Sequence, residues 1–125
     1  DFKPANIHAG GLRYHGAGMI ISQLIKDGYM YGVDIPQSES FEAGMLFART
    51  EGIIPAPESC HAIAATIREA MKAKEAGEEK VILFCLSGHG LIDMPSYESY
   101  INGDLHDYAV SDDEIKKFLA TVPEV

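Results

Sequence analysis

The chain has 125 residues, of which 46% are hydrophobic and 23% are charged. These proportions are typical of one soluble globular domain and exclude a disordered or collagen-like chain. Ten basic and nineteen acidic residues give a net charge of −9 at pH 7. A surface of this charge repels polyanions, so we expect neither nucleic acid nor an anionic membrane as a partner.

The two cysteines, Cys60 and Cys85, each lie within an apolar pattern, which predicts small buried side chains rather than a disulfide framework or a zinc site. This use of cysteine favours a reducing, cytoplasmic setting. The longest apolar run, residues 81–86, is too short to cross a bilayer, and the chain does not open with a charged and then apolar leader. It begins at Asp1 without a methionine, from which we expect that a further segment precedes it.

The first half of the chain predicts a helix, a strand and a second helix. Apolar residues recur at three- and four-residue intervals over residues 16–26, which predicts a helix with one buried stripe that ends before Gly28. Residues 29–35 form a short β-prone run. Helical spacing returns over residues 39–50 and stops at Gly52.

The second half contains the longest periodic segment. It predicts a helix over residues 57–76, introduced by the proline-rich elbow at residues 54–57 and ended by Gly77. Residues 81–86 are apolar throughout rather than alternating, which is expected of a central strand covered on both faces. Two terminal helices are predicted over residues 94–103 and 111–121, the second announced by the capping box SDDE.

Together these elements predict an α/β fold with an open parallel sheet between layers of helices. The two strands, residues 29–35 and 81–86, should be parallel neighbours or near neighbours in that sheet. The loop SGHG follows the central strand directly. Because ligands bind beyond the carboxyl ends of strands in open α/β sheets, this loop is the best candidate site in the sequence.

Four phrases of the sequence are unusual for a plain scaffold. They are HAGGLRYHG at residues 8–16, ARTEGIIPAPE at 48–58, SCHA at 59–62 and LSGHG at 86–90. At this spacing they resemble the carboxy-terminal part of the tryptophan synthase β chain family, in its second, divergent branch. The resemblance covers residues 8–100.

The resemblance implies part of a pyridoxal phosphate enzyme of fold type II, which replaces the hydroxyl of serine, or the phosphate of O-phosphoserine, with indole to give tryptophan. The family carries its Schiff-base lysine in a His-Lys-x-Asn phrase and binds the cofactor phosphate with a Gly-Gly-Gly-Ser-Asn loop, and both are absent from this chain. We therefore expect residues 1–125 to form a single partial domain with a partial three-layer sheet. It would be inactive without the missing amino-terminal half, and the parent would pair as a homodimer.

The resemblance also assigns the side of the site that faces the cofactor ring. Ser87, with Gly88, would meet the pyridine nitrogen, and a neutral hydroxyl does not hold that nitrogen protonated. Glu51 would lie beside the ring and assist proton handling, and Gly11 would let the backbone pass close to the ring. Without the family, these residues are explained by a strand-ending turn, an exposed last helical turn and a flexible turn respectively.

Arg13 is the main departure from the family pattern, because standard β chains carry an aspartate there. Together with His15 it replaces an acid and a proline with one permanent and one titratable positive charge, which suits a phosphate or carboxylate of the amino-acid donor. The alternative is a solvated cation in a loop. Side-chain spacing suggests no metal site, and His61 is expected to be a hydrogen-bonded packing residue.

Two classes of function remain open at this point. One is the carboxy-terminal part of a pyridoxal phosphate lyase that needs its other half. The other is a stand-alone α/β module that keeps the scaffold but binds a partner without catalysis, because fold and function separate readily.

Overall fold

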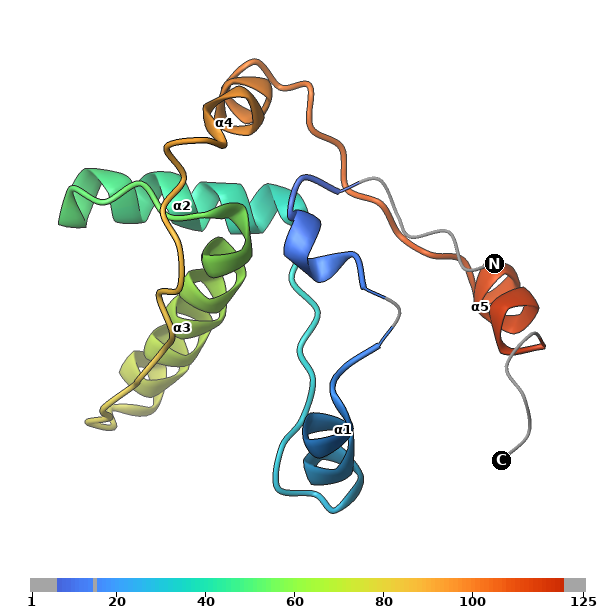
Figure 1. Cartoon of the computed structure of the whole chain (residues 1–125). Helices are drawn as coiled ribbons and strands as arrows, with labels where there is room; N and C mark the ends of the chain where they lie inside the picture. The colour runs from blue at the N-terminus through green and yellow to red at the C-terminus, as the bar shows by residue number, and fades with distance from the viewer. Residues whose placement is uncertain (1–6, 15, 121–125) are drawn as a thin grey trace.

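The computed structural model describes residues 7–14 and 16–120. Within these ranges it contains one 3-10 turn and five α-helices and no β-strand (Figure 1). The elements, in chain order, are η1 (Gly10–Leu12), α1 (Met19–Lys26), α2 (Gln37–Glu51), α3 (Pro57–Ala76), α4 (Met94–Ile101) and α5 (Asp112–Leu119).

The two long helices begin and end where local signals predicted. Helix α3 has a proline in its first turn, where the missing N–H costs no hydrogen bond. Gly52 and Gly77 end α2 and α3 in the left-handed conformation, with φ of 70° and 66°, which a residue with a Cβ adopts only with strain. The helix over residues 57–76 is thus confirmed, and α2 begins two residues earlier than predicted.

The shorter helices are confirmed with shifted ends. Helix α1 begins at Met19, three residues later than predicted, and α4 ends at Ile101, two residues early. The capping box of α5 forms as expected, since Ser111 Oγ accepts from the Glu114 N–H at 3.3 Å and Glu114 Oε2 accepts from the Ser111 N–H at 3.0 Å. The predicted end of that helix, residue 121, lies outside the described residues.

The core lies where α2, α3 and α4 meet (Figure 1). Phe41, Cys60 and Tyr97, one from each helix, form one buried cluster. Helices α2 and α3 approach closely at Gly44, because a Cβ there would lie 2.5 Å from Cys60 Sγ. The burial predicted for Cys60 is therefore confirmed.

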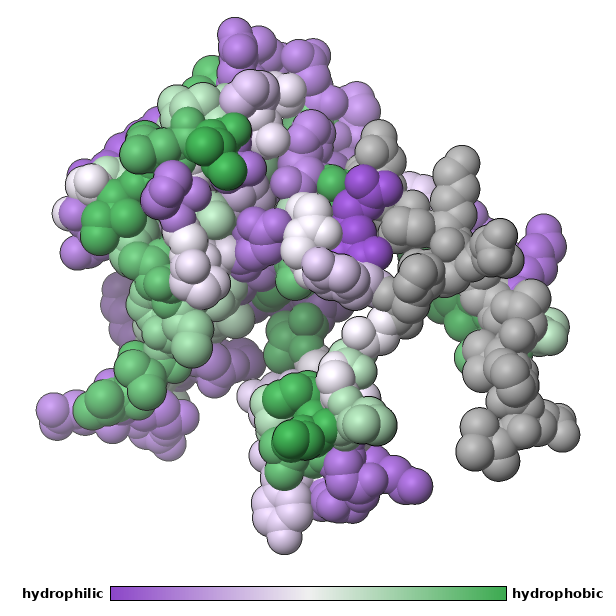
Figure 2. Space-filling model, in the orientation of Figure 1, coloured by the Kyte–Doolittle hydropathy of each residue, from purple (hydrophilic) through white to green (hydrophobic). Residues whose placement is uncertain are grey.

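Helix α1 does not have the buried stripe that the sequence predicted. It contains no buried residue, and Ile20 is 77% exposed. In Figure 1 the helix lies apart from α2 and α3, and Figure 2 shows hydrophobic side chains gathered on it. The stripe exists in the sequence, but no described element packs against it. None of the described helices is both long and apolar enough to cross a membrane.

The predicted parallel sheet is not confirmed, because residues 29–35 and 81–86 are not assigned as strands. Val81 is fully exposed and Leu83 is 95% exposed, and Cys85 is exposed as well, against the prediction of burial. A strand is defined by pairing with a neighbour, and these segments have none in the described residues. The described ranges contain one isolated bridge, an antiparallel one between Pro55 and His89.

The first turn of α2 is capped by a residue far along the chain. Asp107 accepts hydrogen bonds from the Ser38 N–H at 2.9 Å and from the Ser38 hydroxyl at 2.5 Å. These bonds hold the pKa of the Asp107 carboxyl below its usual range. The segment after α4 is thereby tied to the start of α2.

We expect Asp107→Asn to lower the free energy of unfolding by about 0.5 to 1 kcal/mol at pH 7, the lower part of the range for a lost cap, because the site is exposed. A carboxylate whose pKa is lowered on folding stabilises the fold above its unfolded pKa of about 3.9 and stops doing so as pH falls through the folded value. The difference in the free energy of unfolding between wild type and Asp107→Asn should therefore shrink as the pH is lowered below about 4. Denaturant unfolding at pH 7 and pH 3 measures this, with the exposed Asp104→Asn as control.

Candidate functional site

The candidate site is built where the loop after residues 81–86 meets the elbow before α3. The Ala56 N–H donates to the Gly88 carbonyl at 3.0 Å, and the Gly90 N–H donates to the Ile54 carbonyl at 2.8 Å. Two neighbouring backbone bonds of this kind hold the two segments in a fixed register. The elbow in turn follows α2 directly, so the end of α2, the start of α3 and the loop form one unit.

Ser87 is fixed to the first turn of α3 through its backbone. Its N–H donates to Ser59 Oγ at 3.3 Å, and Ser59 is buried. The bond uses the backbone of Ser87, which is exposed, so its hydroxyl is available to a group outside the described chain. Gly88 passes close to the elbow, because a Cβ at Gly88 would lie 3.1 Å from the Ala56 Cβ.

Gly11 reaches the same helix terminus from the other side. Its N–H, in the η1 turn, donates to Glu58 Oε1 at 2.7 Å, and a Cβ at Gly11 would lie 3.1 Å from Glu58 Cγ. A side chain there would require the Glu58 side chain to shift by a few tenths of an ångström. The structure therefore brings Ser87, Gly88 and Gly11 to the amino-terminal end of α3.

The structure does not link the other predicted site residues to Ser87 or Gly11. Glu51 is the last residue of α2, exposed and three residues before Ile54 of the elbow, and it forms no hydrogen bond with Ser87 or Gly11 in the part of the chain described. Arg13 is exposed and closes the η1 turn, its N–H donating to the Gly10 carbonyl at 3.2 Å. His15 lies outside the described residues.

Glu58 and Ser59 are contact residues that the sequence argument did not single out. Both lie in the first turn of α3, where an acidic side chain is favourably placed and can accept from neighbouring N–H groups. Both lie in the phrases that carry the family resemblance, ARTEGIIPAPE and SCHA, which assigned neither of them a role. These two side chains hold the η1 turn and the loop onto α3.

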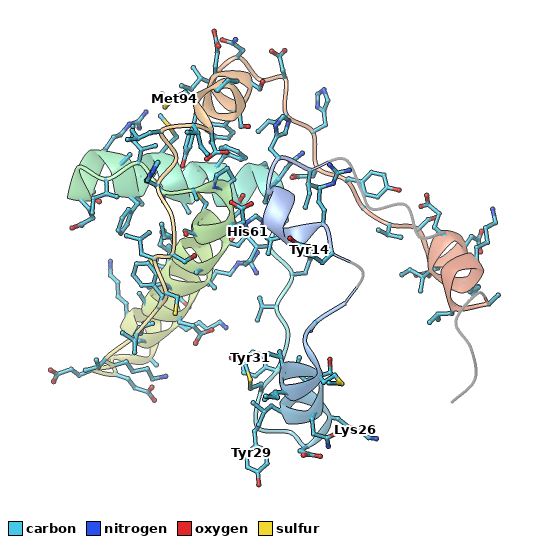
Figure 3. All side chains as sticks on the ribbon, in the orientation of Figure 1. Tyr14, Lys26, Tyr29, Tyr31, His61 and Met94 are labelled. Carbon is cyan, nitrogen blue, oxygen red and sulfur yellow. The ribbon has the colours of Figure 1, made fainter. Side chains whose placement is uncertain are left out.

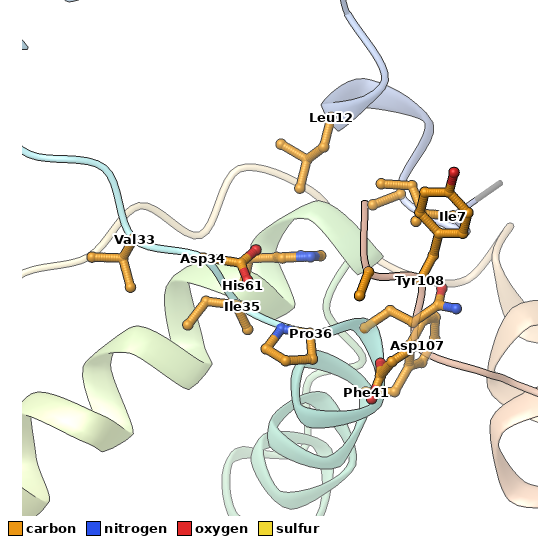
Figure 4. A pocket seen from close by; sticks show the side chains of 13 residues that line it. Ile7, Leu12, Val33, Asp34, Ile35, Pro36, Phe41, His61, Asp107 and Tyr108 are labelled. Carbon is orange, nitrogen blue, oxygen red and sulfur yellow. The ribbon is translucent and has the colours of Figure 1, made fainter. Parts of the chain in front are cut away.

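A cavity of ≈ 370 Å³ borders the η1 turn on the side of Leu12 (Figure 4). Its lining includes Asp34 and His61, and none of residues 86–90 line it, so it is separate from the Ser87 loop.

The expected hydrogen bond of His61 is present, between Nδ1 and the Pro57 carbonyl at 2.9 Å. Figure 3 places this side chain on α3 beside η1.

Two of the residues that the resemblance assigns to the ring side of a pyridoxal phosphate site, Ser87 and Glu51, present exposed polar groups. An available neutral hydroxyl at Ser87 and an exposed carboxylate at Glu51 are polar groups of the kind that such a ring needs. They supply neither a Schiff-base lysine nor a glycine-rich phosphate loop. No group of three or more His, Cys, Asp or Glu that could hold a metal ion occurs in residues 7–14 and 16–120.

No protein-family model matches the chain. Curated proteins do match it. The chain is 59% identical over 107 residues to the tryptophan synthase beta chain 2 of Aquifex aeolicus, covering 86% of this chain and 25% of that protein. It is 61% identical over 97 residues to the tryptophan synthase beta chain 2 of Thermotoga maritima, covering 78% of this chain and 23% of that protein. The corresponding protein of Pyrococcus furiosus is 56% identical over 106 residues, with 85% and 24% covered.

Identities of this size over about four-fifths of the chain show common descent. The chain is a relative of the tryptophan synthase β chains, and the resemblance inferred from the four phrases is confirmed. It spans about a quarter of the length of the curated relatives that it matches.

Proposed function

We propose that the chain is the carboxy-terminal, ring-facing part of a pyridoxal phosphate-dependent tryptophan synthase β chain. The parent would join indole to an amino-acid donor, serine or O-phosphoserine, in the cytoplasm and as a homodimer. The chain alone would lack activity, because the groups that hold the cofactor covalently and bind its phosphate belong to the rest of the parent.

One observation supports this proposal most strongly. The elbow joins the end of α2, which carries Glu51, to the start of α3, and its backbone bonds to the loop that carries Ser87. Glu51 and Ser87 are 36 positions apart in the sequence, and the resemblance places both beside one cofactor ring. The elbow attaches both to one backbone unit.

The chemistry of the two side chains suits the proposed roles. Pyridoxal phosphate, when bound, supplies an electron sink for bonds at the α-carbon of the amino acid. The Ser87 hydroxyl would hydrogen-bond the ring nitrogen without giving it a full proton. The Glu51 carboxylate, at the exposed end of α2, would hold or accept a proton near the ring.

The remaining three-quarters of the parent would complete the sheet that is missing here. A groove of ≈ 580 Å³ beside α3 is lined by Met30, Tyr31 and Val33 on one segment and by residues 82–85 on another. Arg68 of α3 fixes one side of this groove by donating to the Asp34 carbonyl at 3.1 Å. Both segments carry exposed apolar side chains, so we propose that strands of the missing portion pair with them there.

The proposal is tested on the intact parent protein. Purified with pyridoxal phosphate, it should make tryptophan from indole and a serine-type donor. Ser87→Asp should lower the rate by about tenfold or more, because a carboxylate favours a protonated ring nitrogen and so a different reaction course. Ser22→Asp, which adds the same charge on exposed α1, is the control. Equal rates for the two variants, or no tryptophan formation by the wild type, would contradict the proposal and favour a binding module.

A further inference from the structure

Tyr97 of α4 is a buried polar group to which the proposed function gives no role. It is 2% exposed and packs edge-on against Phe41 of α2, with ring centroids 5.1 Å apart. Burial raises the pKa of its hydroxyl, so the group keeps its proton at all physiological pH values. Tyr97 is therefore a permanent hydrogen-bond donor inside the core.

The Tyr97 hydroxyl donates its one hydrogen bond to the elbow. Tyr97 Oη donates to the Pro55 carbonyl at 2.5 Å. Cys60 Sγ lies 3.3 Å from Tyr97 Oη. Because the tyrosine proton is already donated to Pro55, the Cys60 thiol is the donor in this second contact. Burial raises the pKa of the Cys60 thiol, which keeps it protonated for this purpose. The chain of bonds runs from α3 through α4 to the elbow.

The loop that carries Ser87 lies against both the Tyr97 ring and the Pro55 carbonyl. A Cβ at Gly90 would lie 3.0 Å from the Tyr97 ring and would collide with the Pro55 carbonyl oxygen. The Gly90 N–H bonds to Ile54, one residue before Pro55. Elbow and loop therefore meet directly over the tyrosine, and a shift of the Pro55 carbonyl would move both.

We propose that Tyr97 is a positioning residue, whose hydroxyl sets the register between the elbow after Glu51 and the loop of Ser87. This inference rests on the proposed function for its consequence, which is that Ser87 and Glu51 keep a fixed relation to the cofactor ring. The hydroxyl acts through the backbone and touches no reacting atom. Tyr97 is thus distinct from the two side chains that face the ring.

The variant Tyr97→Phe tests the inference in the intact parent protein without cofactor. Phenylalanine keeps the ring that packs on Phe41 and removes only the hydroxyl. The Ala56 and Gly90 amides should exchange hydrogen roughly two- to tenfold faster, which corresponds to the loss of one ordinary hydrogen bond. Mass spectrometry of peptides over residues 52–60 and 85–92 measures this exchange.

Tyr100→Phe is a matched control, because Tyr100 stacks on the same Phe41 with centroids 5.8 Å apart. It should leave both peptides unchanged. Equal exchange in Tyr97→Phe and Tyr100→Phe would overturn the inference. A uniform rise over all helices in Tyr97→Phe would also overturn it, since that indicates only a loss of global stability.

A second readout tests whether the effect reaches the cofactor. Titration with pyridoxal phosphate, followed by absorbance, should show binding weakened about two- to tenfold by Tyr97→Phe. In a Ser87→Ala background the same change should have little further effect, because the two residues act through one loop. Additive effects would overturn the link to Ser87. If the wild type binds no cofactor, the proposed function fails, while the exchange data still decide the role of Tyr97.

Discussion

The isolated 125-residue chain is expected to make no measurable tryptophan from indole and serine and to bind no pyridoxal phosphate covalently. None of its seven lysines follows a histidine in the phrase that the family uses, and the phosphate loop is absent. Covalent catalysis by the cofactor requires both the lysine and a site for the phosphate. Absorbance of the purified chain after incubation with the cofactor and removal of the excess measures binding, and tryptophan fluorescence measures product.

The intact parent protein under the same conditions is the control, and it should show both cofactor absorbance and product. Non-specific reaction of the cofactor with surface lysines is distinguished by its lack of saturation at one equivalent. Stoichiometric absorbance of the isolated chain that disappears when one lysine is replaced would show that the chain contains a complete site, against this prediction.

Arg13→Asp in the intact parent protein is expected to change the choice of amino-acid donor. A serine hydroxyl is a poor leaving group that benefits from a carboxylate, whereas phosphate leaves as a stable anion and benefits from a cation. Arg13 is exposed and directly follows the η1 turn, which carries Gly11, and the resemblance assigns Gly11 a place close to the ring. An arginine fork binds phosphate oxygens in a bidentate, charge-assisted manner. The wild type should therefore prefer O-phosphoserine.

The ratio of kcat/KM for O-phosphoserine to that for serine should fall by roughly tenfold to a hundredfold in Arg13→Asp, the range for a lost charge-assisted bond. Steady-state rates with each donor measure the ratio. Lys26→Asp makes the same change of charge on α1 and should leave the ratio unchanged. Equal use of both donors by the wild type, or an unchanged ratio in Arg13→Asp, would remove the substrate role of Arg13.

Helices α2 and α3 could be predicted from the sequence because their signals are local. A proline in the first turn and a glycine in the left-handed conformation after the last turn act within a few residues. Helix α1 was predicted as a helix for the same reason. The buried stripe predicted for it is wrong, since burial depends on a partner, and the described chain provides none for this helix.

The sheet shows the same limit more clearly. An unbroken apolar run such as residues 81–86 indicates a strand that is buried on both faces, and this prediction concerns neighbours as much as the segment itself. The described residues contain no strand that could be such a neighbour, and the chain spans about a quarter of the length of its curated relatives. Within the run, Ile82 and Phe84 are partly buried, whereas Val81 and Leu83 are almost fully open to solvent.

The candidate site was predicted in part. Motifs located Ser87, Gly88 and Gly11, which the structure brings to one helix end. Glu58 was not identified because a single acid in a first helical turn is too common to suggest a contact 47 residues away. Tyr97 was not identified either, since its partner is a backbone carbonyl. Every residue has a carbonyl, so the sequence does not indicate which one accepts the bond.

The exposed apolar side chains of residues 81–86 have a consequence for synthesis in the cell. If these residues form the carboxy-terminal part of the parent, they leave the ribosome last, after the segments proposed to cover them. The apolar surface then meets its partner as it emerges, and the time for which it could associate with other chains is short. Made alone, the same residues have no such cover, and the isolated chain would be expected to aggregate or to require a chaperone.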